Sequence, residues 1–289
     1  MTNRPALLIA NDKSRRGAEI APFIAALEQG GMSIRREGCT KAGDIARLIR
    51  TLKDEVSCVL LGGGDGTMHA AASQLHETGL PLGILPLGTA NDLARSLGIE
   101  ATADAAAAVV LGGKTRAIDL GTVNGIPFFN VASLGLSVGV TKRLTGLMKR
   151  RFGIFAYPLA AAVTIVRRGR FRASLRADGE EVVTTTLQIA IGNGRYYGGG
   201  TVVDEHAQID DGLLHVYSLE PRARWRLLFM ARAFRAGQHS QLREVRTMTC
   251  RTLTISTSRP RDITADGEMV SRTPAHFGIL PGAVRVFTA

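Results

Sequence analysis

A glycine-rich turn at residues 61–67 has the clearest capacity for chemistry, and it reads Leu61-Gly62-Gly63-Gly64-Asp65-Gly66-Thr67. Glycines let backbone N–H groups crowd around an anion, because no side chain interferes. A helix that starts just after the turn adds partial positive charge at its N-terminus. The segment therefore predicts a phosphate-binding loop, although it matches neither the P-loop nor the Gly-x-Gly-x-x-Gly pattern. The alternative is a tight strand-to-helix turn that Asp65 caps.

Asp65 and a second loop refine this interpretation. A carboxylate beside phosphates is repelled unless a cation lies between them, and Mg²⁺ prefers the oxygen ligands available there.

The second loop, residues 86–92, also follows a strand. Ligands of open α/β sheets bind outside the carboxyl ends of the strands, so both loops would face one ligand. Thr89 is suited to hydrogen-bond a phosphate or a ribose, whereas Asn91 alone would be an N-cap in most proteins.

The elements that must position these loops alternate between strand and helix. Apolar runs predict strands, and apolar residues at three- and four-residue spacing predict helices. The strands are expected at Ala6–Ala10, Met32–Glu37, Cys58–Leu61 and Leu82–Leu85, and the helices near Ile20–Leu27, Gly43–Leu52, Met68–Leu75 and Ala101–Ala108. The alternation predicts an α/β domain with a doubly wound, mostly parallel sheet over residues 1–120.

After about Gly121, strand-like runs dominate and predict a mainly antiparallel second domain over residues 121–274. Asp178-Gly179 is a strong hairpin-turn signal between two of these runs. The strand candidates are Phe171–Ala177, Val182–Ile191, Leu213–Leu219 and Thr249–Ser256. A terminal strand at Ala283–Phe287 leaves open that residues 275–289 return to the first domain.

Composition bounds the class of protein. The chain has 289 residues, of which 45% are hydrophobic and 21% charged, as in ordinary globular proteins. Its formal net charge of +11 favours anionic partners such as nucleotides, nucleic acid or an acidic membrane surface, although a basic surface also aids solubility. The three separated cysteines argue against a disulfide framework or a structural zinc site and favour a reducing, cytoplasmic compartment.

Contact with a membrane is expected to be peripheral. The longest apolar stretch, Gly153 to Val166, is shorter than the ~20 residues that a spanning helix needs. Basic residues mix with aromatic ones at residues 149–152, at residues 167–172 and in the amphipathic segment Arg222 to Arg235. Such segments suit an anionic bilayer surface. For the third segment, a helix packed on its own domain with a solvated face is an equal alternative.

The motifs, taken in order, resemble the catalytic domain of diacylglycerol kinases, in particular the bacterial lipid kinase branch of that family. The glycine turn is followed by the Pro-Leu-Gly-Thr-Ala-Asn-Asp loop, and further motifs keep the family's order along the whole chain. These are Asn11-Asp12-Lys13-Ser14, Cys39-Thr40, Asp119-Leu120-Gly121, residues 129–135, Gly192-Asn193-Gly194, Asp210-Asp211-Gly212-Leu213 and Asp266-Gly267-Glu268.

This resemblance implies a nucleotide-binding N-terminal domain and a C-terminal β-sandwich that takes the lipid, with the active site between them. It implies ATP and Mg²⁺ as cofactors and a lipid hydroxyl as phosphate acceptor. The residues that it implies for ATP are Thr40, Gly63, Gly64, Asp65, Gly66, Thr67, Thr89 and Asn91. It implies a magnesium site at Asp211 with the backbone carbonyls of Gln208 and Leu213.

Glu268 is implied as the general base, with Asp65 as the second catalytic residue. Alone, Asp266-Gly267-Glu268 would usually be only a turn. In a phosphoryl transferase, however, a carboxylate must orient and deprotonate the attacking hydroxyl. Asp92 and Asp119 are candidates to hold basic residues near the phosphates, and equally to be surface or capping aspartates. The glycine-rich loop at Asn193 is expected at the lipid-facing cleft.

The chain also departs from the family pattern. His69-Ala70 stands where the family usually has Asn-Glu, Asp12 replaces a proline, Arg15 replaces a glycine, and Glu205-His206-Ala207 precedes the acidic pair. Two alternatives stay open: a soluble kinase of the NAD kinase type, and a binding protein whose catalysis has lapsed. No nucleic-acid-binding motif appears. The sequence does not decide between a monomer and a homodimer, nor does it identify the lipid.

Overall fold

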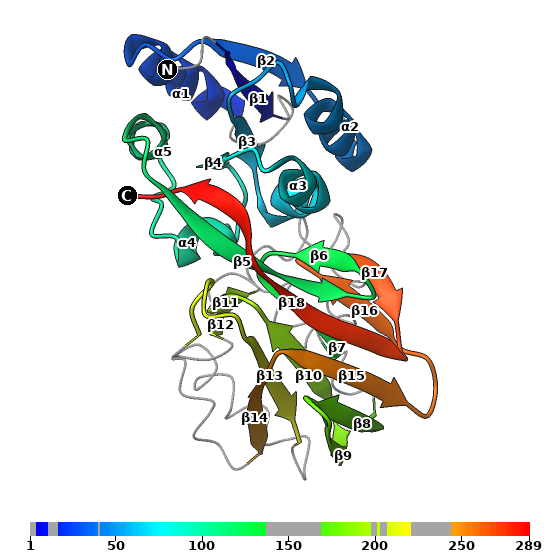
Figure 1. Ribbon diagram of the computed structural model, residues 1–289. Coiled ribbons are helices and arrows are strands. Elements are labelled where there is room, and N and C mark those ends of the chain that lie inside the picture. The colour runs from blue at the N-terminus through cyan, green and yellow to red at the C-terminus, as the bar shows by residue number, and fades with distance from the viewer. Residues whose placement is uncertain are drawn as a thin grey trace, which may run out of the picture.

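The computed structural model describes residues 4–10, 17–39, 41–136, 169–197, 201–202, 207–220 and 244–289, and all structural statements concern these residues. Figure 1 shows an α/β part that holds the N-terminus and a β-rich part below it. The sequence motifs at Asn11 to Ser14, Thr40, Arg15 and Glu205-His206 lie outside the described residues, as do the segments at 149–152 and Arg222 to Arg235.

The α/β part contains four parallel strands in the order β2-β1-β3-β4. Because helices cover both faces, the central strands are apolar throughout, and β1 and β4 are completely buried. Helix α1 packs against α5, whereas α2 packs against α3 (Figure 1). The doubly wound parallel sheet is thereby confirmed. Its strands are β1 (Ala6–Ala10), β2 (Ile34–Gly38), β3 (Val59–Gly63) and β4 (Leu82–Pro86).

The helices form where the sequence has an apolar stripe. In α2 the buried side chains are Ile45, Leu48, Ile49 and Leu52, at helical spacing. Helix α3 starts earlier than its apolar stripe suggested, directly after Gly64, and ends at Gly79 with a left-handed cap (φ 65°). The helical elements are η1 (Gly17–Glu19), α1 (Ile20–Gln29), α2 (Ala42–Leu52), α3 (Asp65–Thr78), α4 (Asp92–Ser96) and α5 (Ala103–Leu111).

The β-rich part contains a six-stranded antiparallel sheet in the order β14-β13-β10-β7-β16-β17. Its inward side chains share one apolar cluster with those of strands from the other sheet. The predicted antiparallel β-sandwich is therefore confirmed. The six strands are β7 (Val131–Gly135), β10 (Gln188–Gly192), β13 (Leu214–Leu219), β14 (Val245–Cys250), β16 (Asp262–Ala265) and β17 (Glu268–Arg272).

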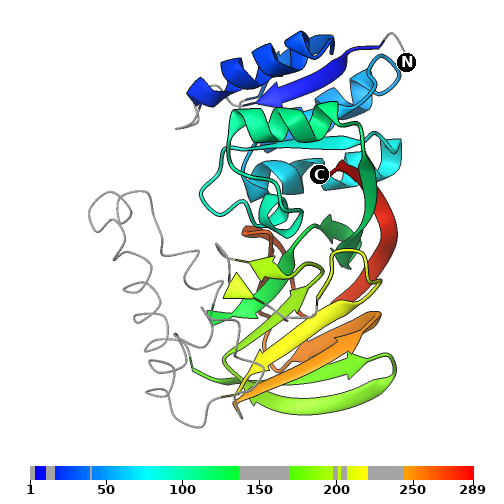
Figure 2. The same cartoon turned by 90° about the vertical axis from the view of Figure 1, so that its left-hand side faces the viewer.

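One long strand, β18 (Ala275–Phe287), joins the two parts, as the red ribbon in Figures 1 and 2 shows. Its end pairs in parallel with β4 at Val286, and its start pairs antiparallel with β15. A register shift between Leu280 and Val284 bends it where it passes from one part to the other. The other strands are β5 (Thr115–Val123), β6 (Ile126–Phe128), β8 (Phe171–Ala177), β9 (Glu180–Thr186), β15 (Thr252–Thr257) and the short pair β11 (Tyr196–Tyr197) and β12 (Thr201–Val202).

Two predicted single strands are wrong, because each is divided between the two sheets. The run Val182–Ile191 becomes β9 and β10, with the break at Leu187, where Thr186 accepts a hydrogen bond from the backbone N–H of Gln188. The run Thr249–Ser256 becomes β14 and β15, with the break at Arg251, whose backbone N–H donates to the Asp178 carboxylate. At both breaks a polar side chain holds the backbone where the chain passes from one sheet to the other.

The hairpin predicted at Asp178-Gly179 is confirmed: both residues have positive φ, and Ala177 pairs with Glu180. Within the described ranges, no helix combines the length and the apolar character needed to cross a bilayer.

Candidate active site

The glycine turn connects β3 to α3, with Gly64 as the N-cap residue of the helix. Gly63 is needed there because a Cβ would lie 2.2 Å from Oγ1 of Thr67. The backbone N–H groups of Thr67 and Met68 close the first turn onto the Gly64 carbonyl. The N–H groups that precede these two in the turn have no carbonyl partner within the helix, as at any helix start, which makes the turn a suitable anion-binding position.

The second loop lies directly against the first. A Cβ on Gly88 would be 2.5 Å from Cα of Gly64, so the two loops touch backbone to backbone. The N–H of Leu87 also donates to the Gly63 carbonyl (3.0 Å). The two strand-end loops predicted to share a ligand thus form one continuous surface.

Asn91 fixes the shape of the second loop. Its side-chain Oδ1 accepts from the N–H of Gly88 (2.9 Å), and its Nδ2 donates to the carbonyls of Pro86 (3.3 Å) and Gly88 (3.0 Å). Its backbone is left-handed, with φ 50°. The side chain makes no cap bond to α4, although Asn91 is the N-cap residue of that helix. The observed role of Asn91 is therefore to hold the shape of its own loop, and its contact with ATP stays a prediction. Thr89, in the same loop, is exposed.

Asp65 joins three elements. Its Oδ1 accepts from the N–H of Leu93 in α4 (3.2 Å) and from Nδ2 of Asn130 at the start of β7 (3.4 Å). Burial raises the pKa of the Asp65 carboxyl, and the charge of Asp266 adds to the rise, while the N–H of Leu93 opposes it. Asp65 thus caps α4 and lies within the electrostatic reach of the acidic hairpin.

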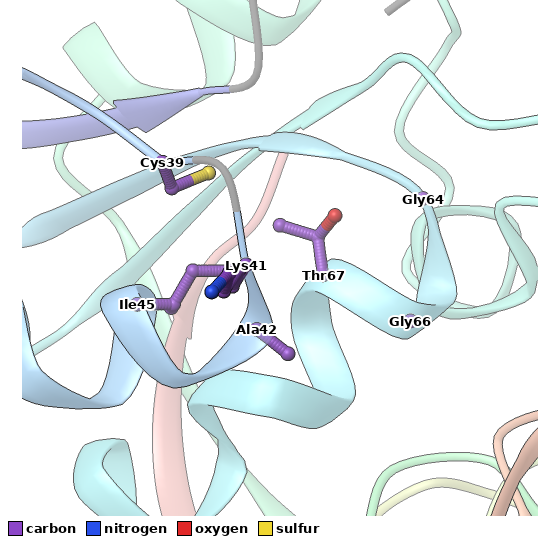
Figure 3. A pocket seen from close by; sticks show the side chains of 7 residues that line it. All are labelled: Cys39, Lys41, Ala42, Ile45, Gly64, Gly66 and Thr67. Carbon is purple, nitrogen blue, oxygen red and sulfur yellow. The ribbon is translucent and has the colours of Figure 1, made fainter.

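A pocket of about 310 Å³ lies between the N-terminal ends of α2 and α3 (Figure 3). In Figure 3, residues Lys41 and Ala42 at the start of α2 lie across from Thr67 in the first turn of α3. The predicted residue Thr40 lies outside the described residues, between two that line the pocket. The lining residues are Cys39, Lys41, Ala42, Ile45, Gly64, Gly66 and Thr67.

The acidic motif near the C-terminus is a hairpin turn between β16 and β17. Asp266 and Gly267 both have positive φ (48° and 92°), and Ala265 pairs with Glu268. The Asp266 carboxylate is 1% exposed. It accepts hydrogen bonds from three consecutive backbone N–H groups, those of Phe129 (2.8 Å), Asn130 (2.9 Å) and Val131 (3.2 Å). Asp266 thereby anchors the turn to the adjacent strand β7.

The same hairpin touches α3. A Cβ on Gly66 would lie 3.5 Å from Oε1 of Glu268. One turn further along the helix, Nδ1 of His69 lies 3.3 Å from Oδ2 of Asp266. Gly66 also lines the pocket, so this one residue lies next to both the pocket and Glu268, the proposed base.

The structure brings together the three residues predicted to hold a metal. The Asp211 carboxylate accepts from the backbone N–H groups of Gln208 (3.0 Å) and Leu213 (2.9 Å), and it bonds to Nε2 of His215 (2.8 Å). In the described part of the chain, no group of three or more His, Cys, Asp or Glu side chains is arranged to bind a metal ion. The observed role of Asp211 is to close its own loop, and metal binding there stays a prediction.

Asp119 and Asn193 have structural roles. The Asp119 carboxylate accepts from the N–H groups of Gly212 (2.7 Å) and Gly282 (2.7 Å), which ties the 208–213 loop to β18. Asn193 is completely buried and donates from Nδ2 to the carbonyls of Asp119 (2.8 Å) and Phe129 (2.9 Å). The structure does not support Asp119 as a surface or helix-capping aspartate, because the residue lies in β5 and is 3% exposed. Its suggested partners Lys13, Arg15 and Arg16 lie outside the described residues, so that role stays a prediction.

Sequence reasoning missed Lys41, Asp266 and the contact of His69. Lys41 had a signal in its position beside Thr40, just before the helix that lines the pocket. Asp266 stands in a motif that drew attention only for its glutamate. The bond between His69 and Asp266 could not be predicted from local sequence, because its two residues are 197 positions apart in the chain.

Two family models match this chain. One, described as the diacylglycerol kinase catalytic domain, matches residues 5–123. The other, described as the YegS C-terminal NAD kinase beta sandwich-like domain, matches residues 130–288.

Individual proteins match over nearly the whole length. A protein named "Probable lipid kinase YegS-like" from Pseudomonas aeruginosa is 33% identical over 288 residues, which cover 97% of this chain and 93% of that protein. A protein named "Diacylglycerol kinase" from Mycobacterium tuberculosis is 32% identical over 289 residues, with 96% and 93% covered. A crystal structure of a diacylglycerol kinase from Bacillus anthracis superposes with a TM-score of 0.78 at 18% identity, covering 100% of this chain and 98% of that one, and supports the fold.

Proposed function

The chain belongs to the YegS-like and diacylglycerol kinase family of lipid kinases, and on that premise we propose that it transfers the γ-phosphate of ATP to a lipid hydroxyl, with Glu268 as general base. The family resemblance drawn from the ordered motifs is thereby confirmed. One observation supports the finer proposal most strongly. Gly66 lines the pocket between α2 and α3 and also lies against the Glu268 carboxylate.

The nucleotide is assigned to the pocket because the pocket offers what a triphosphate needs. Its walls include the starts of two helices, α2 and α3, whose first backbone N–H groups attract anions. Gly64 and Gly66 leave the backbone open to the ligand. Lys41 adds a positive charge to the pocket lining on the α2 side (Figure 3).

Magnesium belongs to this proposal as the counter-ion of the phosphates. The fit is chemical: Asp65 supplies a carboxylate at the glycine turn, and Mg²⁺ takes carboxylate oxygens together with those of the substrate. When bound, the ion would neutralise the charge that builds up on the phosphates. Asp65 would hold it there, and Asp211 with the carbonyls of Gln208 and Leu213 is the second predicted position.

Glu268 supplies the proton chemistry. Its side chain accepts the proton of the lipid hydroxyl while the hydroxyl oxygen bonds to the γ-phosphorus, the bond to the bridging oxygen breaks and ADP leaves. The backbone N–H groups at the start of α3 hold the transferred group next to Gly66. Because Glu268 begins an exposed edge strand, a large substrate can approach it from outside.

The acceptor is a lipid of the diacylglycerol type or a related lipid with a free hydroxyl. We also propose that the protein works at an anionic membrane surface in the cytoplasm, because its net charge is +11. Binding to liposomes should then rise with anionic lipid content and fall with salt.

The test is transfer of label from γ-labelled ATP with Mg²⁺ to a panel of lipids in mixed micelles, with NAD as a soluble control. The panel should contain diacylglycerol, monoacylglycerol, phosphatidylglycerol, a sphingoid base and ceramide. Label in a lipid supports the proposal. Label only in NAD would select the NAD kinase alternative, and label in none of them would favour a protein whose catalysis has lapsed.

A further inference from the structure

His69 is the point where helix α3 holds the acidic hairpin. Its ring nitrogen Nδ1 lies 3.3 Å from Oδ2 of Asp266. We propose that His69 is a positioning residue for the reaction: by donating from Nδ1 to Asp266, it fastens the 266–268 turn to α3 and so sets Glu268 against the glycine turn. This inference rests on the proposed function and adds to it the residue that aligns the base.

The direction of the hydrogen bond follows from the chemistry of the partner. An ionised carboxylate can only accept, so the proton lies on Nδ1 of His69. The Asp266 carboxylate also accepts from three backbone N–H groups in β7 and just before it, which hold it in place. Asp266 is therefore a fixed anchor, and His69 connects that anchor to the α/β part of the molecule.

The contact is placed to align Glu268. Gly66 and His69 are one turn apart on α3 and so lie on the same face of the helix. Gly66 lies against Glu268, and His69 lies against Asp266, two residues earlier in the same hairpin. Helix and hairpin thus meet at two adjacent positions, of which one is the His69–Asp266 bond and the other is the site of the reaction.

The His69–Asp266 contact is largely shielded from solvent. The His69 side chain is 13% exposed and that of Asp266 is 1% exposed. Burial alone lowers the pKa of His69, but the bond to Asp266 and the charges of Asp266 and Glu268 outweigh it, so that the pKa lies above its ordinary value.

Other charged groups around His69 do not offer a competing partner in the described residues. Strand β6 (Ile126–Phe128), which also packs on α3, carries no ionisable side chain. Arg285 of β18 bonds to the carbonyl of Gly79, beyond the far end of α3. Lys41, the residue before α2, lines the pocket. In α2 itself Asp44 pairs with Arg47 (3.6 Å) and Arg50 is exposed. Asp65, one turn before His69 on α3, bonds to Leu93 and Asn130.

The position of the donor nitrogen on His69 predicts which amide side chain can replace it. The Nδ2 atom of an asparagine is attached to Cγ, as Nδ1 of histidine is, so an asparagine can donate from nearly the same place. A glutamine would present its amide near the position of Nε2 instead. If the role of residue 69 is to donate a hydrogen bond to Asp266 from this position, His69→Asn should keep that hydrogen bond, and His69→Gln should lose it.

The experiment measures kcat and the KM for ATP in lipid phosphorylation for His69→Asn, His69→Gln and His69→Ala. The matched control is His76→Ala, because His76 lies two turns along the same helix and its Nδ1 contacts only the backbone carbonyl of Ala283 (3.2 Å) within the described structure. Misalignment of a catalytic group can cost about 100-fold, so we expect kcat to fall about 10- to 100-fold in His69→Gln and His69→Ala, with the KM for ATP unchanged. His69→Asn and His76→Ala should retain the wild-type kcat.

A double-mutant cycle with Asp266→Asn then tests whether His69 affects kcat through Asp266. Because His69 acts through Asp266, His69→Ala should cost little further activity once Asp266 is changed. Wild-type kcat in His69→Ala, equal losses in His69→Asn and His69→Gln, or losses that simply multiply in the double variant would each overturn the inference.

Failure of the proposed function would be visible separately. If the wild-type protein labels no lipid, the cycle is measured by thermal unfolding instead, at a pH well above the folded-state pKa of His69. There His69→Gln and Asp266→Asn should again be non-additive, and His69→Asn should be close to wild type. Additive shifts in that measurement would overturn the inference without any reference to activity.

Discussion

Gly66 lies against Glu268: a Cβ on this glycine would be 3.5 Å from the Oε1 atom of the glutamate. One residue belongs to the first turn of α3 and the other to a hairpin near the C-terminus. Because Gly66 also lines the pocket between α2 and α3, this contact places an acidic group next to the glycine turn that lines the pocket.

The contact between the two loops predicts a strong effect of Gly88→Ala. Its Cβ would lie 2.5 Å from Cα of Gly64, and neither backbone can yield without opening the site. We expect a loss of about 1–3 kcal/mol in the free energy of unfolding, as for overpacked positions, together with weaker ATP binding. Urea unfolding and nucleotide titration measure the two effects. The control is Gly38→Ala, at an exposed glycine with no atom within 4 Å of the added Cβ; wild-type behaviour of Gly88→Ala would contradict the packing described.

Lys41 should contribute to the binding of the nucleotide and not to chemistry. It lines the pocket at the start of α2 (Figure 3). For Lys41→Met we expect the KM for ATP to rise about tenfold, equivalent to ~1.4 kcal/mol, with kcat preserved. Steady-state kinetics with varied ATP checks this, and Lys53→Met, at the other end of α2, should leave the KM unchanged. A fall in kcat at saturating ATP would instead place Lys41 in the chemical step.

The pair of His69 and Asp266 should make stability depend on pH. The pKa of His69 is raised in the folded protein, so its protonated form is favoured by folding. Its contribution to stability is therefore fully present below the unfolded pKa of about 6.5 and is lost as the pH rises through the folded value. Thermal unfolding should show wild type more stable than His69→Asn below that pH, and the difference should vanish well above it. A constant difference would mean that His69 does not titrate against Asp266.

Local patterns were sufficient to predict the two loops, the hairpin at Asp178 and the alternation of the first domain, because each depends on neighbouring residues alone. The division of two runs at Leu187 and Arg251 could not be predicted, since a strand that changes sheet keeps its apolar pattern. The role of Asn91 was equally hidden. Asparagine suits an N-cap, a turn and a ligand contact alike, and only the positions of Pro86 and Gly88 decide among them.

The site itself was predicted in parts that the sequence could not assemble. Asp65 and Glu268 stand in recognisable motifs, but nothing local indicates that the Asp266 carboxylate accepts from the N–H groups of residues 129–131. Such long-range bonds decide which acidic residue is an anchor and which remains free to act. Asp266 is almost completely buried, whereas Glu268 is exposed at the start of its strand.

The measurement that tests the central claim most directly compares wild type with Glu268→Gln in two assays run side by side, phosphate transfer to lipid and equilibrium binding of ATP. The substitution keeps the size of the side chain and removes its ability to take a proton. We predict that transfer falls about 100- to 10,000-fold while ATP binds as in wild type, and that Glu180→Gln, on the exposed edge strand β9, changes neither. Near-wild-type transfer by Glu268→Gln would contradict the account.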